Sequence, residues 1–259
     1  MNSLTLCLYS VSNGHWSSKD CYLRTIQDLE THKVNFADKI VHIKIRPGEE
    51  EFAETMEKDF IKYGYRVLKT VADWRRWHGS HSVEQLKDIF TVFNEIKTDY
   101  IFHLEDDWKI KPISNTLEFW LEQSINLLKS NSEVLQVRIP RQINEFEHFK
   151  SMEKVDDSWK KQGELFSLNP HIIKKRDLSI ILQYILASKD QILPFLRNQQ
   201  MNVEMLFAEI GKRLQVGFNP EKYNIISNNI KPFWSHSSEN IRALHIGNNG
   251  PDDTLEKVQ

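Results

Sequence analysis

Cysteine is scarce in this chain of 259 residues, in which Cys7 and Cys21 are the only two. Two cysteines are too few to form the disulfide framework that stabilises many small secreted domains. Cys7 lies within an apolar run, where a cysteine more often fills space in a core than acts as a nucleophile. The scarcity favours a reducing, cytoplasmic setting.

An excess of basic charge and long apolar runs are also missing. The net charge is -2, whereas a general nucleic-acid binder needs a basic surface to displace counterions from phosphates. No apolar run approaches the length of a membrane span, and the first residues lack the basic stretch of a signal peptide. We therefore expect no nucleic-acid partner, no transmembrane segment and no secretion signal.

The composition that remains is ordinary for a globular protein. Hydrophobic residues make up 40% and charged residues 27% of a chain long enough to bury a substantial core. The sequence shows no internal repeat, low-complexity tract or clear linker. A single domain over residues 1–259 is the simplest interpretation.

Strand-like and helix-like patterns alternate along the first half. Short apolar or alternating runs predict strands, and apolar positions spaced three and four apart predict helices. The expected order is a strand at 4–11, a helix at 19–32, a strand at 38–45, a helix at 49–63, a strand at 65–71, a loop at 73–82, and a helix at 83–96 with Ser82 as its N-cap. This alternation predicts a parallel sheet with helices on its faces.

The second half is less regular and richer in helix. The expected elements are a helix at 115–129, a strand at 134–139, a polar loop at 141–163, a strand with an internal turn at 164–173, and helices at 178–186, 191–196 and 203–214. We therefore predict an α/β fold with a mixed, mostly parallel central sheet flanked by helices and an α-rich C-terminal half.

An apolar run over residues 100–104 ends in three consecutive acids, Glu105, Asp106 and Asp107. The run is typical of a buried strand, and open α/β sheets bind ligands beyond the carboxyl ends of their strands. Adjacent carboxylates raise one another's pKa unless a cation or several donors compensate, and oxygen ligands suit Mg²⁺ or Mn²⁺. A solvated loop or a helix N-cap is the alternative interpretation.

The order of elements resembles that of the GT-A glycosyltransferases, which have the nucleotide-diphospho-sugar transferase fold. The segment Asp99–Asp107 is similar to the strand that carries the family's Asp-x-Asp motif, with Glu105 in the first acidic position. Further similarities are the first strand's end at Ser10-Val11-Ser12-Asn13, the segment Phe166-Ser167-Leu168-Asn169-Pro170, and His245-Ile246-Gly247. The resemblance implies a nucleotide-binding half at 1–110, an acceptor-binding half at 111–250 and a tail at 251–259.

The resemblance also implies roles for individual residues. Asp107 would bind Mn²⁺ or Mg²⁺ directly, Glu105 would contact the metal, its water shell or the ribose, and Asp106 would orient the nucleotide-sugar donor. A C-terminal histidine often completes the metal site, so His245 is the candidate and His236 the alternative. Ser10, Val11 and Ser12 would meet the base and ribose, Asp73 the edge of the base, and Arg75 a phosphate.

A general base must take the proton of the acceptor hydroxyl if the transferase inverts the sugar's configuration. The family places an acid near the start of a helix in the second half, and Glu204 is the best match here. A helical glutamate that is merely exposed is the alternative. The resemblance thus predicts a metal-dependent, inverting glycosyltransferase that moves a sugar to a glycan or other hydroxyl acceptor.

Three other functions remain to be weighed. A nucleotidyltransferase that makes sugar nucleotides shares this fold, but the turn after the first strand holds a single glycine, Gly14, and no basic residue before Lys19 to bind a triphosphate. A non-catalytic module that binds sugars or nucleotides needs no metal-dependent affinity. A two-metal phosphodiesterase would need more carboxylates and histidines at the strand ends.

Overall fold

The computed structural model describes most of the chain up to residue 215 and two short segments beyond it. The described residues are 3–12, 20–72, 77–112, 115–130, 134–139, 159–161, 166, 168, 170–198, 201–215, 234–236 and 241–245. The backbone alone is described for residues 77–81, 111–112, 159–161, 211–215, 234–236 and 241–245.

A mixed sheet of eight strands forms the centre of the molecule, in the order β3-β2-β1-β4-β8-β6-β9-β7. The first four are parallel and comprise β1 (Leu4–Val11), β2 (Asp38–Ile45), β3 (Arg66–Val71) and β4 (Tyr100–Glu105). The others are β6 (Gln136–Arg138), β7 (Trp159–Lys161), β8 (His171–Lys174) and β9 (Trp234–His236). Strand β8 runs antiparallel to both β4 and β6, so the sheet is mixed beyond β4.

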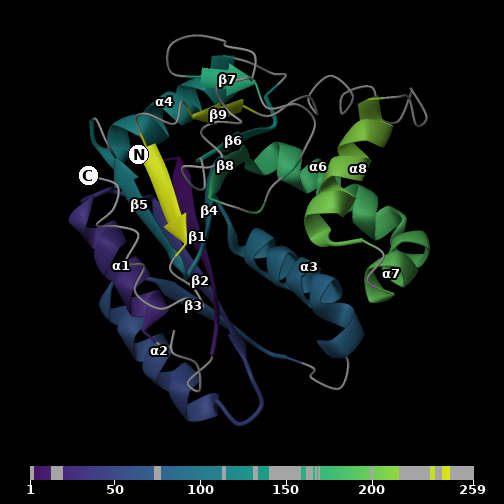
Figure 1. Ribbon diagram of the computed structural model, residues 1–259, viewed down its shortest axis with the longest axis horizontal. Coiled ribbons are helices and arrows are strands. Elements are labelled where there is room, and N and C mark those ends of the chain that lie inside the picture. The colour runs from purple at the N-terminus through teal and green to yellow at the C-terminus, as the bar shows by residue number, and fades with distance from the viewer. Residues whose placement is uncertain are drawn as a thin grey trace.

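Helices cover both faces of this sheet (Figure 1). One face carries α1 (Cys21–Thr31), α2 (Glu50–Lys62) and α4 (Leu117–Ser130). The other carries α3 (Trp77–Glu95), α6 (Lys175–Ala187), α7 (Lys189–Arg197) and α8 (Val203–Gln215). The prediction of an α/β fold with a mixed, mostly parallel sheet between helices is confirmed.

The side chains of strand β1 show why the sheet is buried between two layers of helices. Leu4, Leu6 and Leu8 pack against the first group of helices, while Cys7 points to the second group, and all four side chains are fully buried. Successive side chains of a strand point to opposite faces, so a strand covered on both sides needs a nearly continuous apolar run. Each buried leucine contributes roughly 1.5–3 kcal/mol relative to an exposed one.

A separate two-stranded sheet joins distant parts of the chain. Strand β5 (Trp108–Pro112) pairs antiparallel with β10 (Ile241–His245). Strand β5 was not expected from the sequence, although Trp108 and Ile110 are buried and alternate with Lys109 and Lys111. That alternation was a usable strand signal, but the preceding acids indicated a turn into a helix or a loop.

Several predicted boundaries were wrong. Helix α3 begins at Trp77, so residues 77–82 are helical where a loop was expected. Helix α6 begins at Lys175, directly after β8, and β7 lies inside the predicted loop at 141–163. Local composition was misleading in each case because tertiary packing overrides weak propensities for small and polar residues.

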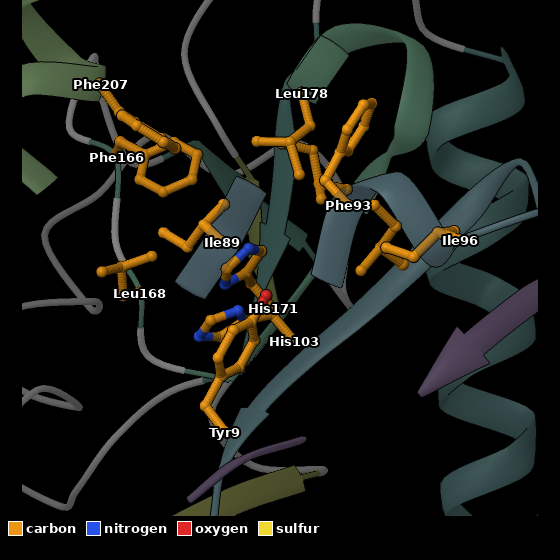
Figure 2. A pocket seen from close by; sticks show the side chains of 12 residues that line it. Tyr9, Ile89, Phe93, Ile96, His103, Phe166, Leu168, His171, Leu178 and Phe207 are labelled. Atoms are coloured by element: carbon orange, nitrogen blue, oxygen red, sulfur yellow. The ribbon is translucent and has the colours of Figure 1, made fainter. Parts of the chain in front are cut away.

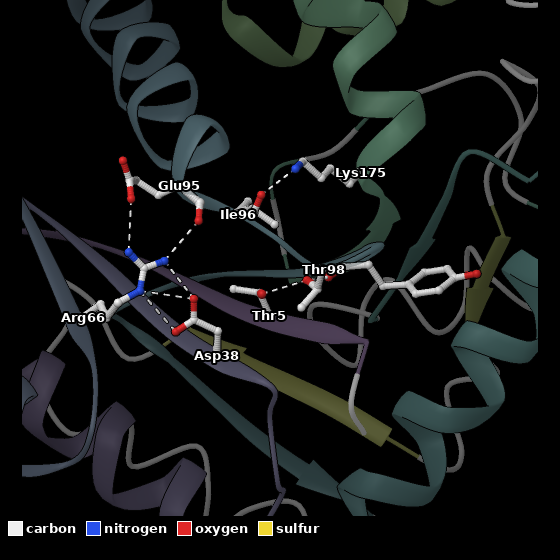
Figure 3. Close-up of polar contacts among 8 residues, drawn as sticks. Thr5, Asp38, Arg66, Glu95, Ile96, Thr98 and Lys175 are labelled. Atoms are coloured by element: carbon white, nitrogen blue, oxygen red, sulfur yellow. Dashed lines mark hydrogen bonds and ion pairs between the residues drawn. The ribbon is translucent and has the colours of Figure 1, made fainter.

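One edge of the sheet is held by Arg66 in β3 (Figure 3). Its guanidinium lies 2.8 Å from the carboxylate of Asp38 in β2 and 3.1 Å from that of Glu95 at the end of α3. The hydrogen bond with Asp38 raises the pKa of Arg66 further above its usual value. The Arg66 side chain is 42% exposed, so we expect this network to orient α3 rather than to contribute much stability.

Among the described residues, no helix combines the length and the apolar character that crossing a membrane requires.

Candidate functional site

The three acids form a turn at the carboxyl end of β4. Glu105 is the last residue of β4, Asp106 and Asp107 make the turn, and Trp108 begins β5. All three acids are half-buried, whereas Trp108 is 2% exposed. We call Glu105–Asp107 the acidic turn. Its position at the end of a parallel strand is the one expected from the sequence.

Strand β1 holds the acidic turn from one side. The backbone N–H of Asp106 donates to the carbonyl oxygen of Tyr9 at 3.0 Å. The hydroxyl of Ser10 donates a short hydrogen bond to the Asp106 carboxylate. Both contacts come from the strand that lies parallel to β4, so the orientation of Asp106 follows directly from the sheet register.

Helix α1 holds the acidic turn from the other side through Thr25. Its hydroxyl lies 2.6 Å from the carbonyl oxygen of Asp106 and 3.0 Å from that of Trp108. Thr25 is fully buried, so these carbonyls are satisfied by a protein hydroxyl instead of water. Thr25 was not expected at the site, because a threonine on the buried face of an amphipathic helix gives no signal of its own.

Burial and, to a lesser degree, the neighbouring negative charges raise the pKa of one acid in this turn. Burial raises the pKa of Asp106 to about 8, and the charges of Asp107 and Glu105 contribute in the same direction, while the hydrogen bond from Ser10 opposes it. A carboxyl group in such surroundings gains from a nearby cation. The acidic turn therefore has the electrostatic character of a cation site.

The strand register brings His245 to the acidic turn. In the β5–β10 pair, His245 is opposite Trp108, the residue that follows Asp107. His236 lies instead in β9, opposite Trp159 in the large sheet. Only the backbone of these two histidines is described. The two histidines proposed for the metal site thus lie in different sheets, and His245 is the one whose backbone adjoins the turn.

The described side chains alone do not make a complete metal site. Among them, no group of three His, Cys, Asp or Glu residues is arranged to hold a metal ion. The side chain of His245 is outside that set. A metal at the acidic turn would therefore need ligands beyond the three acids, and an imidazole or the phosphates of a substrate would suit it.

The two serines at the end of β1 are buried and make hydrogen bonds within the protein. Ser10 and Ser12 are 3% and 0% exposed, whereas Val11 between them is 37% exposed. The hydroxyl of Ser12 accepts the N–H of Arg46 at 2.8 Å, and its own N–H donates to the carbonyl oxygen of Lys44 at 2.9 Å. Contacts of these residues with a base or ribose stay a prediction. Asp73 and Arg75, the other expected nucleotide contacts, lie outside the described residues.

Glu204 lies in the first turn of α8, on the face of the sheet opposite α1. Its carboxylate oxygen Oε1 accepts the backbone N–H of Leu168 at 2.6 Å. Leu168 belongs to the segment 166–170, one of the stretches in which the sequence resembles GT-A enzymes. The structure therefore joins the proposed base to that segment, and its catalytic role stays a prediction.

A small cavity lies beside Leu168, beneath α3 and α8 (Figure 2). Its volume is about 20 Å³, and most of its lining is apolar. His103 and His171 stack there with ring centroids 4.8 Å apart, and Tyr9 packs on the other side of His103 at 4.6 Å. Within the described part of the chain, Nε2 of His103 has no hydrogen-bond partner. Burial, and then the charge of His171, lower the pKa of His103 well below its usual value.

A buried charge cluster lies at the neighbouring strand β2. The ammonium of Lys44 is 2.7 Å from Asp88 and 3.6 Å from Glu84, both on α3. His42 lies 3.6 Å from Asp88 and 3.0 Å from the hydroxyl of Thr70. Burial raises the pKa of Asp88 to about 6 and lowers that of His42 to about 4. These contacts attach the first half of α3 to the sheet.

Comparison with known proteins gives structural similarities only. No protein family and no curated protein matches the sequence. The fold is similar to that of the mannosyltransferase PcManGT from Pyrobaculum calidifontis, solved in complex with GDP-Man and Mn²⁺, with a TM-score of 0.44, 8% identity, and coverage of 69% of this chain and 46% of that one. This chain thus spans less than half of that protein.

Two further structures are similar to the same extent. Glucosyl-3-phosphoglycerate synthase from Mycobacterium tuberculosis, solved with Mn²⁺ and UDP-glucose, has a TM-score of 0.43, 10% identity, and coverage of 98% of this chain and 74% of that one. S. aureus TarS, solved with UDP, has a TM-score of 0.43, 9% identity, and coverage of 69% and 48%. Similarity of this size carries no argument about reaction, donor or acceptor.

Proposed function

We propose that this protein is a metal-dependent glycosyltransferase that transfers a sugar from a nucleotide diphosphate donor to a hydroxyl acceptor. The observation that carries the proposal is the acidic turn, which lies at the carboxyl end of a parallel strand and is fixed by Ser10 and Thr25. Ligands of open α/β sheets bind at this edge. A turn that is merely solvated would not need a hydrogen bond to its carboxylate from a serine that is 3% exposed.

The acidic turn fits a hard divalent cation in its donor set. Asp107 would be the direct ligand, Glu105 would contact the metal, its water shell or the ribose, and His245 would complete the set. The pKa of Asp106, raised to about 8 by burial and the adjacent acids, supports this assignment, because a cation relieves such crowding. When bound, Mn²⁺ or Mg²⁺ would supply Lewis-acid stabilisation for the charge that develops on the leaving diphosphate.

The chain's own residues would position the donor. Ser10 holds the Asp106 carboxylate in one conformation, so the Asp106 side chain need not be ordered when the donor binds. The exposed side chain of Val11 at the end of β1 offers a surface for the base or ribose. In this proposal Ser12 shapes the same strand end, and Asp73 and Arg75 contact the base edge and a phosphate from the segment that follows β3.

Glu204 is proposed as the general base of an inverting reaction. The N–H of Leu168 fixes one carboxylate oxygen, which restricts the rotation of the carboxyl group. A base held in this way could take a proton from an acceptor bound against the segment that contains Leu168.

Calorimetric titration with UDP, GDP and dTDP, each with and without Mn²⁺, tests the proposal. We expect one nucleotide to bind at least about tenfold more tightly with the metal present, which corresponds to roughly 1.4 kcal/mol. Asp107→Asn should remove this gain. Asp190→Asn, a change of the same kind on the exposed start of α7, should leave it intact.

Hydrolysis of the matching nucleotide-sugar completes the test. Slow release of the nucleotide diphosphate is expected from the parent and not from Asp107→Asn. Nucleotide binding that does not depend on metal, or an Asp107→Asn protein as active as the parent, would refute the metal-site assignment. Metal-independent sugar binding without turnover would favour a non-catalytic module.

A further inference from the structure

A second concave region lies at the opposite end of β4 from the acidic turn. Strand β4 begins at Tyr100 and ends at Glu105, and Tyr100 pairs with Lys174 at the end of β8. Around this pair lies a pocket of about 430 Å³, which falls in the size range of small-molecule sites. We call it the basal pocket.

Positive charge dominates the basal pocket. Lys174, Lys175 and Arg176 line it in succession, where β8 passes directly into α6, and Asp99 is the acid in its lining. The three cations exceed the single carboxylate by two charges. Residues that follow one another at a strand-to-helix junction point in different directions, so they can surround a ligand rather than form a row.

The lysines of the basal pocket are held in place. The ammonium of Lys175 donates to the carbonyl oxygen of Ile96 (Figure 3). The same ammonium lies 5.7 Å from the ring centre of Phe93. Lys174 lies 3.8 Å from Asp177, which is 2% exposed; that separation is too long for a hydrogen bond. Burial lowers the pKa of Lys174, so the half-buried ammonium gains from a further anion.

Arg176 is the cation available to a ligand. It is exposed, and among the described residues it makes no hydrogen bond or ion pair. A guanidinium presents paired donors that match the oxygens of a phosphate group. Ser179, one turn further along α6, adds a hydroxyl to the same pocket.

We propose that the basal pocket binds the phosphate group of a small phosphorylated molecule. Arg176 and Lys174 contact the phosphate oxygens, Ser179 donates a hydrogen bond, and the remainder of the molecule packs on Phe93 and Tyr100. Lys129 supports this charge distribution, because its ammonium lies 5.8 Å from the ring centre of Tyr100. The pocket is larger than a phosphate ion needs, which favours a phosphate monoester over the free ion.

Calorimetric titration of the full chain with inorganic phosphate and with glycerol 2-phosphate tests this site. Both titrations are made without divalent metal and at constant ionic strength in chloride. We expect saturable binding at one site, with the monoester binding more tightly. Arg176→Gln should weaken both by at least about tenfold, the scale of a lost charge-assisted contact.

Two variants serve as controls. Arg197→Gln makes the same change on the exposed last turn of α7 and should bind as the parent does. Asp107→Asn should also bind phosphate normally, because the acidic turn lies at the other end of β4. This result separates the basal pocket from the proposed donor site, so either proposal can fail without the other.

The proposal would be overturned if phosphate binding did not saturate, or if Arg176→Gln bound phosphate as tightly as the parent. It would also be overturned if Asp107→Asn lost phosphate binding. Binding of citrate as tight as that of the monoester would overturn it as well, because it would identify a general site for carboxylates. Circular dichroism of Arg176→Gln establishes that this variant is folded. Ser179→Ala provides a second measure of the same site: its phosphate affinity should fall about threefold, as expected for the loss of one neutral hydrogen bond.

Discussion

His245 lies directly opposite Trp108 in the two-stranded sheet, so β10 ends beside the residue that follows the acidic turn. This pairing puts the backbone of His245 on the same short sheet as the strand that leads away from Asp107. Asp107 and His245, the two residues proposed above to bind a metal, therefore belong to segments more than a hundred residues apart in the sequence.

Removal of the His245 imidazole is expected to weaken the metal site. His245→Ala should lower Mn²⁺ affinity in the presence of nucleotide at least about tenfold, measured by electron paramagnetic resonance of free Mn²⁺. His236→Ala is the matched control because it makes the same change on β9. If His236→Ala has the larger effect, the assignment of His245 is wrong.

The Ser10 hydroxyl is expected to stabilise the fold through Asp106. Ser10→Ala leaves the half-buried carboxyl of Asp106 without this donor and should lower the free energy of unfolding by about 1–3 kcal/mol, measured by urea denaturation. Ser130→Ala, at the exposed end of α4, should change it by less than about 0.5 kcal/mol. Equal effects of the two changes would contradict the role given to Ser10.

Stability should depend on pH through His42. Its pKa is lowered from 6.5 to about 4 by burial and by the charge of Lys44. Between these values the unfolded chain binds a proton that the folded protein does not, so stability present above pH 6.5 is lost as the pH falls toward 4. Relative to His42→Gln, the parent should lose roughly 3 kcal/mol of unfolding free energy over this range, measured by urea denaturation at each pH.

Asp88 provides a control with the opposite sign. Its pKa is raised from 3.8 to about 6, mainly by burial. Between these values the folded protein keeps a proton that the unfolded chain has released, so its contribution falls as the pH rises. Relative to Asp88→Asn, the parent should become less stable from pH 4 to pH 6. The same slope for both comparisons would show that these two groups do not set the pH dependence.

Two substitutions of Glu204 separate catalysis from support. Glu204→Gln keeps an oxygen that can accept the Leu168 N–H but cannot act as a base, so kcat should fall by about a hundredfold or more while stability is retained. Glu204→Ala should also lower the free energy of unfolding, by about 1–2 kcal/mol. Unchanged kcat in Glu204→Gln would leave Glu204 with a structural role alone.

The sequence predicted the parallel half of the fold well because its signals there are strong. The run from Leu4 to Val11 and the alternation in β2 match the observed strands, and the helical spacing of Tyr22, Ile26 and Leu29 matches the buried face of α1. Beyond β4 the strands are short, and their partners lie far away in the sequence. Short strands such as β7 depend on pairing rather than on local pattern, so no window of sequence identifies them.

At the candidate site, the sequence identified the three acids of the acidic turn but not the residues that hydrogen-bond to this turn. Three adjacent carboxylates after an apolar run are easily recognised in the sequence. Thr25 and Lys44 have no such local signal, because the contact of Thr25 with the acidic turn and that of Lys44 with α3 exist only in the folded chain. His103 lies inside the run that was treated as apolar, and its stacking on His171 follows only from the antiparallel register of β8.

The pairing of β5 with β10 also fixes when the strand that follows the acidic turn can gain its partner strand. Residues 108–112 leave the ribosome long before residues 241–245, so β5 has no partner strand until almost all of the described chain has been synthesised. Contacts between segments this distant close late and slowly in folding. A nascent chain that stops short of β10 can form the parallel half of the sheet, yet it lacks the strand that carries His245.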